Sequence, residues 1–408
     1  MTDLHPDAHP IPTHIPPELV RDFDFATLPG ADSDPFLASR KAVRDQPDIF
    51  FAREIHGRGS WVITRHDLIR EVFQNAESFS SHHNADFSML IDEDWPLLPL
   101  ESDPPDHATW RILLNPIFAP GRMKTLEAQI LQLAQELVDG FVGRGEVDFV
   151  REFAEIYPIV IFLRMFGLPL DLADRFVAWE NGLIHGLTMD QRRDAAKSIV
   201  GYLREIIAER RETPTDDLIS YVAQAVVNGQ PISDNAALGV CFLLYTAGLD
   251  TVANMLSFMM KHLAEHPDSQ KILRDDPGKI PYAIEEMLRA FPIIISHRLV
   301  TRDIDFHGVQ MKSGDRIVLP TMLAGRDETQ FQQPDTIDFA RERVNHITFA
   351  AGPHRCIGSH LARRELRFAL ETWLTRVPPF RIKSGEKPVT HGVGVFGVSY
   401  LPLAWDVD

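Results

Sequence analysis

The stretch Phe349-Ala350-Ala351-Gly352-Pro353-His354-Arg355-Cys356-Ile357-Gly358 decides how this chain of 408 residues is interpreted. It is a glycine-containing loop that leads directly into a segment with helical apolar spacing. A cysteine thiolate at such a junction gains from the helix dipole and from free backbone N–H groups, which lower the pKa of its thiol. A lone cysteine before a helix is more often buried and inert. The glycines of the loop instead favour a thiolate that lies beside a bound flat ligand.

This loop resembles the cysteine-ligand loop of cytochromes P-450, in which a phenylalanine, a glycine, a basic residue, the cysteine and a final glycine keep fixed spacing. The five matching positions are Phe349, Gly352, His354, Cys356 and Gly358. The resemblance implies haem b (iron protoporphyrin IX), with Cys356 as the axial ligand of its iron. Phe349 is expected to keep water from the sulfur, and the two glycines are expected to let the backbone approach the flat haem.

The implied fold class is mainly α with small β-sheets, with the haem between a long central helix and the helix after the cysteine loop. A single domain over 1–408 is expected, because no linker, low-complexity tract or internal repeat divides the chain. Apolar spacing and turn residues predict the following parts. They are an irregular segment over 1–47, β-rich parts over 48–64, about 293–320 and 380–408, and mainly helical parts over 66–290 and 359–376.

The bulk composition narrows the class of protein. A formal net charge of −17 argues against a nucleic-acid binder. Two cysteines do not make a disulfide framework, and the N-terminus has no apolar signal, so a cytoplasmic location is predicted. The apolar stretch from Asn235 to Met260 is long enough to span a membrane. The acid Asp250 in its middle favours a buried central helix instead.

The sequence Tyr245-Thr-Ala-Gly-Leu-Asp-Thr-Val-Ala-Asn-Met-Leu256 is similar to the oxygen-activation helix of the same family. Ala247 and Gly248 are small and would leave room for dioxygen. The Thr251 hydroxyl can bond the carbonyl of Ala247, four residues earlier, and open the helix locally. Oxygen activation consumes two protons, and Asp250 and Thr251 are suitable relay groups. The alternative for Asp250 is a buried acid that bridges helices.

Further residues follow from the resemblance. Glu286 and Arg289 lie three apart, so they share one helix face. They are expected to form a buried charge network with Arg341 that holds geometry. Basic donors suited to the haem propionates are His107, Arg111, Arg298 and His354.

The substrate is predicted to be a small hydrophobic molecule. The camphor-hydroxylating subfamily is the group that the sequence resembles most, and it implies the pocket positions Trp95, Leu243, Thr246, Ala247, Ile294 and Val395. Because these side chains are mainly apolar, a monoterpenoid or norisoprenoid is expected. Trp95 aligns with a tyrosine that anchors a ketone in camphor-binding members. Its indole N–H could donate to a ligand, or the ring could simply pack on the core.

No flavin or nicotinamide fingerprint occurs in the sequence. Electrons are therefore expected from a 2Fe-2S ferredoxin that an NAD(P)H-dependent flavoprotein reductase reduces. Acidic partners of this kind need a basic docking patch, whose candidates are Arg70, Arg111, Arg343, Arg363 and Arg364. The alternative, for all of them except Arg111, is that these arginines form ordinary surface ion pairs. Rival functions are a peroxide-driven peroxygenase and a non-catalytic haem sensor or carrier.

Overall fold

The computed structural model describes residues 11–55, 57–83, 85, 87–186, 188–392 and 395–407. The chain forms two compact units. Unit 1 comprises Met1–Asn84, Glu286–Arg355 and Thr390–Gly397, and unit 2 comprises Ala85–Glu285, Cys356–Val389 and Val398–Asp408. The units interleave along the chain, so no single cut in the sequence separates them. One domain over 1–408 stays a prediction.

A six-stranded sheet forms the framework of unit 1. Its strand order is β1 (Val20–Arg21), β2 (Ile49–Ile55), β3 (Arg58–Ile63), β11 (Arg316–Pro320), β8 (Ile295–Val300) and β4 (Phe79–Ser80). The antiparallel pair β2–β3 confirms the strands predicted over 48–64. Trp61 and Ile317 pair across β3 and β11 and are fully buried, so apolar side chains hold the centre of the sheet.

Short helices accompany this sheet. Helix α1 (Pro35–Val43) lies within the segment that was predicted to be irregular, so that prediction is wrong there. Asp34 caps the helix by accepting a hydrogen bond from the Leu37 N–H, and Pro35 occupies the first turn. The proline-rich composition concealed these start signals. The remaining helices and strands of unit 1 are η1 (Pro17–Leu19), η2 (Phe25–Thr27), α2 (His66–Gln74), β9 (Ile304–Phe306), β10 (Val309–Met311) and α13 (Thr321–Ala324).

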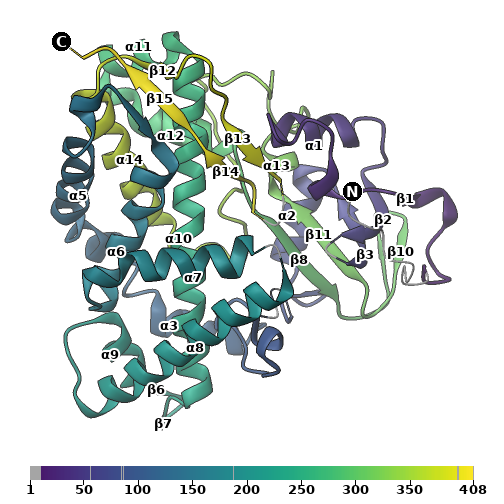
Figure 1. Cartoon of the computed structure of the whole chain (residues 1–408). Coiled ribbons are helices and arrows are strands. Elements are labelled where there is room, and N and C mark those ends of the chain that lie inside the picture. Colours follow the sequence, from purple (N-terminus) through teal and green to yellow (C-terminus); the bar gives the residue numbers. More distant parts are fainter. Residues whose placement is uncertain are drawn as a thin grey trace. The chain divides into compact units, whose positions relative to one another are not determined.

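Unit 2 is mainly helical and is built around α10 (Asp234–Glu265), a helix of 32 residues drawn in green in Figure 1. Helices α6 (Ile156–Phe166), α7 (Ala173–His185), α8 (Met189–Glu212) and α14 (Ser359–Arg376) all contact α10. By length and composition α10 could cross a membrane, and it is the one such helix among the described residues. However, 61% of its most apolar window is buried inside unit 2. This burial agrees with the predicted central helix.

The bounds of α14 coincide with the helix predicted over 359–376. Helix α12 (Ile280–Ala290) crosses the boundary between the units, and β13 (Val389–His391) begins at another boundary. The structure is mainly α with small sheets, as predicted. Strand β14 (Gly397–Tyr400) crosses the boundary after Gly397. The other elements of unit 2 are η3 (Phe87–Ile91), α3 (Asp106–Leu114), α4 (Pro120–Lys124), α5 (Glu127–Asp139), η4 (Val142–Arg144), β5 (Glu146–Asp148), η5 (Val150–Ala154), η6 (Leu170–Leu172), α9 (Leu218–Ala223), β6 (Val226–Val227), β7 (Gln230–Pro231), α11 (Pro267–Asp275), η7 (Pro277–Lys279), β12 (Phe380–Ile382) and β15 (Pro402–Trp405).

Candidate functional site

Cys356 lies directly before α14, at the junction that the sequence predicted. The residue is exposed, yet protein atoms crowd the sulfur closely enough that burial raises the pKa of its thiol. The backbone N–H groups of Gly358 and Ser359 and the cations Arg111 and Arg363 act in the opposite direction without outweighing burial, so the pKa of the thiol is raised and not lowered as the sequence predicted. An accessible sulfur surrounded by such donors suits a metal ligand.

The middle of α10 has one face that protein does not fully cover. Ala247 is exposed, and Leu243, Gly248 and Thr251 are partly exposed, in a helix that is otherwise largely buried. Their spacing places them on the same side of the helix. A Cβ added to Gly248 would meet only Phe162, at an ordinary 3.8 Å. Since α14 contacts α10 within unit 2, an accessible thiol and a face of small residues belong to one unit, which fits a flat group held by sulfur.

Thr251 and Asp250 occupy this part of α10. The Thr251 hydroxyl donates to the carbonyl of Ala247 at 3.0 Å, the bond that the sequence predicted. The helix does not open there, because α10 is continuous from Asp234 to Glu265. A threonine hydroxyl can share a carbonyl of the preceding turn without breaking the helix.

The Asp250 carboxylate has two donors. Its Oδ1 accepts from Asn254 Nδ2 at 2.8 Å and lies 3.0 Å from Nε2 of His185, in α7. The sequence analysis did not identify His185, nor Glu180 one turn earlier. Glu180 had a detectable signal, since it lies between Phe176 and Leu183 on the buried face of α7.

The predicted propionate donors fall into two pairs. His107 and Arg111 lie one turn apart on α3 in unit 2, where burial lowers the pKa of the Arg111 guanidinium and the charge of Cys356 raises it. Arg298 in β8 and His354 in the cysteine loop belong to unit 1. The structure thus brings His107, Arg111 and Cys356 into one unit.

The two loop glycines have different roles. Gly352 has a φ of +69°, and a Cβ there would lie 2.4 Å from the carbonyl oxygen of Phe73. Glycine is therefore required by the contact of this loop with the end of α2, and its predicted role in approach to a ligand stays a prediction. A Cβ on Gly358 would meet only the Cys356 sulfur, at 3.9 Å. Packing of the chain does not demand glycine at Gly358, so close approach of a ligand stays its predicted role. Phe349, in unit 1, is partly buried.

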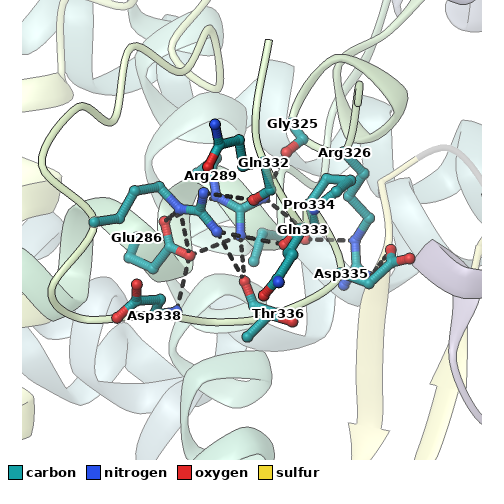
Figure 2. A network of polar contacts seen from close by, with 12 residues as sticks. Glu286, Arg289, Gly325, Arg326, Gln332, Gln333, Pro334, Asp335, Thr336 and Asp338 are labelled. Atoms are coloured by element: carbon teal, nitrogen blue, oxygen red, sulfur yellow. Dashed lines mark hydrogen bonds and ion pairs between the residues drawn. The ribbon is translucent and has the colours of Figure 1, made fainter. Parts of the chain in front are cut away.

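Glu286, Arg289 and Arg341 form one network in unit 1, and Figure 2 shows Glu286 and Arg289 at its centre. Arg289 donates to Glu286 at 2.8 and 2.7 Å, and Nε of Arg341 lies 3.0 Å from the same carboxylate. The remaining Arg289 donors reach the carbonyls of Gly325, Pro334 and Thr336. All five guanidinium N–H groups are thus used, which ties the loop after α13 to α12.

The predicted pocket residues also divide between the units. Ile294 and Val395 form an isolated β-bridge in unit 1. Trp95, Leu243, Thr246 and Ala247 lie in unit 2. The Thr246 hydroxyl donates to backbone carbonyls of its own helix.

Trp95 is 2% exposed and packs on Phe242, with ring centroids 5.0 Å apart. Its indole N–H donates to Glu93 at 2.5 Å, and Arg204 holds the same carboxylate. Of the two alternatives for Trp95, packing on the core describes the structure, in which Glu93 accepts the indole hydrogen bond.

Two arginines of the predicted docking patch are engaged in ion pairs. Arg363 binds Glu285 at 2.5 Å, and Arg364 binds Glu127 at 3.0 Å. For these two the alternative, ordinary ion pairs, describes the structure. Arg70 and Arg343 are exposed.

Comparisons with known proteins identify the family of this chain. The cytochrome P450 family model matches residues 181–391. The probable cytochrome P450 127A1 of Sinorhizobium fredii is 41% identical over 404 residues, covering 97% of each chain. The steroid C26-monooxygenase of Mycobacterium tuberculosis is 33% identical over 77% of this chain and 88% of its own.

Solved structures agree as well. The crystal structure of CYP101J2 covers 98% of this chain and 100% of its own, with a TM-score of 0.88 and 33% identity. For CYP101C1 the coverage is 97% and 100%, with a TM-score of 0.87 and 32% identity. Proteins of this family and fold bind haem b, and the thiol and the small-residue face of α10 fit that group. The chain therefore belongs to the cytochrome P450 family and is a monooxygenase that carries haem b.

Proposed function

We propose that this cytochrome P450 hydroxylates a small hydrophobic terpenoid or norisoprenoid in the cytoplasm, using O2 and electrons from a 2Fe-2S ferredoxin. One observation carries the substrate class. Among the six residues that were predicted to line the pocket, the indole N–H of Trp95 and the hydroxyl of Thr246 both donate to protein acceptors. The other four side chains are apolar. A ligand held by such residues gains from burial of apolar surface rather than from a directed hydrogen bond.

The roles of the chain's residues follow from their chemistry. Haem b, when bound, supplies the activation of dioxygen. Cys356 would hold its iron, and His107, Arg111, Arg298 and His354 would hold its propionates. The exposed Ala247 and the adjacent Gly248 leave room beside α10 for oxygen and substrate. Thr251 and Asp250 hold the protons that the reaction consumes.

We infer the electron donor from the cofactor-binding motifs that the sequence does not contain. It has no nicotinamide or flavin fingerprint, so a small ferredoxin with an NAD(P)H-dependent flavoprotein reductase supplies the electrons. Arg70 and Arg343 are the exposed members of the predicted docking patch, whereas Arg363 and Arg364 are paired with glutamates.

The first test is the optical spectrum of the purified protein, reduced under carbon monoxide and then titrated with terpenoids in the ferric state. We expect a red-shifted Soret band and a low- to high-spin shift with one terpenoid. Cys356→Ala removes the red-shifted band, because alanine cannot bind iron. An intact band in that variant contradicts the ligand assignment. Haem without a response to any terpenoid leaves the family in place and contradicts the substrate class.

The proton role of Thr251 has its own test. Thr251→Ala loses the hydroxyl that bonds Ala247, so the variant consumes NADH but releases hydrogen peroxide instead of product. The measurement is peroxide released per NADH consumed. Tight coupling to product in Thr251→Ala contradicts the relay. Product formed from added peroxide without ferredoxin, at the full rate, favours the peroxygenase alternative.

A further inference from the structure

Helix α7 carries two titratable groups beside Asp250 that the proposed reaction has not yet used. Figure 1 shows α7 crossing α10, and the two helices are in contact. His185 and Glu180 project from α7, and Asp250 comes from α10. The three groups span 70 residues of sequence and meet only in the folded unit 2.

His185 is hydrogen-bonded to Asp250, the more deeply buried of these two side chains. Its Nε2 lies 3.0 Å from Oδ1 of Asp250. The orientation of Asp250 is set from the other side by Asn254, because the side-chain oxygen of Asn254 accepts the Val398 N–H at 3.1 Å. The amide NH2 of Asn254 must therefore face Asp250, where it donates at 2.8 Å. The Asp250 carboxylate is therefore oriented to accept a hydrogen bond from His185.

The same imidazole also reaches solvent. His185 lines a surface hollow of about 520 Å³, together with Asn181, Gly182, Gln191 and Asp194 of α7 and α8. Its side chain is 29% exposed, against 12% for Asp250. His185 thus joins water in the hollow to a carboxylate that water reaches poorly.

The charges around His185 favour its protonated form. Burial alone lowers the pKa of the imidazole, but the hydrogen bond and charge of Asp250 outweigh it, and Glu155 adds to them. Arg192 on α8 acts in the opposite direction, and the net result is a raised pKa. Asp194 is the remaining charged group that lines the hollow.

Glu180 is the second carboxylate of this cluster. Glu180 is 5% exposed, and neither of its oxygens has a hydrogen-bond partner among the described residues. Burial, with a smaller contribution from the charge of Asp250, raises the pKa of Glu180 well above its usual value. Burial therefore favours the neutral form of Glu180, and Asp250 is the carboxylate that is hydrogen-bonded to His185.

We propose that His185 is the proton-supply residue of this monooxygenase, which collects protons from the α7–α8 hollow and passes them to Asp250. In each transfer the doubly protonated imidazole loses its Nε2 proton to Asp250 Oδ1, and Nε2 then regains a proton from a hydronium ion of the hollow, which becomes water. Two such protons, with O2, substrate and two electrons from the ferredoxin, give the hydroxylated product and one water. His185 acts on the reaction only through Asp250, so it is counted as a positioning residue and not as a catalytic one. This inference rests on the proposed relay by Asp250 and Thr251.

The first test measures the pairing without turnover. Histidine-labelled protein in its ferrous carbon monoxide form is titrated by NMR, and His185 is assigned by the signal missing from His185→Gln. We expect its pKa above 6.5, with a fall of about one unit or more in Asp250→Asn, since an opposite charge shifts a pKa by roughly 1–3 units. The same pKa in wild type and Asp250→Asn overturns the inference.

The second test measures peroxide released per NADH from pH 6 to 9, with a surrogate ferredoxin and reductase and the terpenoid that gives the spin shift. The wild-type protein releases more peroxide per NADH as the pH rises through the raised pKa of His185, because the imidazolium loses its proton. His185→Gln releases peroxide at every pH. Its rate of product formation is lower than that of wild type by about tenfold or more, with a larger solvent isotope effect. His185→Arg keeps the charge but cannot release a proton near neutral pH, so we expect it to behave like His185→Gln.

The matched control is His307→Gln. His307 forms a similar pair with Glu71, at 2.9 Å, but both side chains are about half exposed on unit 1. We expect its pH profile to match wild type. If His185→Arg forms product with NADH use as tightly coupled as in wild type, a positive charge at this position suffices. That result would overturn the proposal that His185 supplies protons, and it would leave the relay by Thr251 in place. Tight coupling in Thr251→Ala would overturn the relay and this inference together.

Discussion

Glu286 in unit 1 and Glu180 in unit 2 are helical glutamates buried to nearly the same extent, 1% and 5% exposed. The Glu286 carboxylate accepts from Arg289, Arg341 and the Asp338 N–H. Neither oxygen of Glu180 has such a partner among the described residues. The charged donors of Glu286 tie its carboxylate to neighbouring segments, whereas burial without a donor among the described residues raises the pKa of Glu180. The surroundings, and not the residue type, decide between structural and proton-holding roles.

The largest effect is expected from Glu286→Gln. The variant leaves the fully buried Arg289 without its counter-charge, and breaking a buried ion pair in this way costs about 3–5 kcal/mol. The measurement is the free energy of unfolding of the haem-loaded protein in guanidinium chloride. A loss below about 1 kcal/mol would show that the carbonyl partners of Arg289 suffice without Glu286.

A smaller, pH-dependent effect is expected from Glu180→Gln. Because the folded pKa of Glu180 is raised, the unfolded chain loses this proton first as pH rises above the usual carboxyl range. The wild type therefore loses stability, by about 1.4 kcal/mol per pH unit, until the folded pKa is reached. Glu180→Gln lacks this loss, so its stability relative to wild type grows as pH rises.

The check for Glu180 is a series of unfolding curves from pH 5 to 8. Glu180→Asp keeps an acid at the position and should keep the wild-type slope. Parallel curves for wild type and Glu180→Gln would mean that Glu180 is ionised in the folded protein.

The smallest effect is expected from Arg367→Gln. Arg367 and Glu371 form a helical ion pair at 2.6 Å, like Arg289 and Glu286, but the Arg367 side chain is 50% exposed. Solvent screens such a pair, so a change within about 0.5 kcal/mol is expected in the same unfolding assay. A loss comparable to that of Glu286→Gln would contradict burial as the reason for the difference.

Local geometry explains what could be predicted from the sequence. The Glu286–Arg289 pair and the bond from Thr251 to Ala247 join residues three and four apart, which any helix brings together. The Cys356 loop and the bounds of α14 follow from a glycine loop that runs into apolar helical spacing. Helix α1 was missed because prolines surround its cap.

Only the tertiary structure decided the partners of side chains that point away from their own segment. The sequence indicated that Trp95 could donate a hydrogen bond, but the acceptor is Glu93, which Arg204 holds from 111 residues away. His185 meets Asp250 across 65 residues, and Glu180 lies on the buried face of α7, where none of the described residues donates to its carboxylate. Helical periodicity assigns such residues to a face. Which groups cover that face depends on how distant helices pack, and this packing sets the charge of each buried acid.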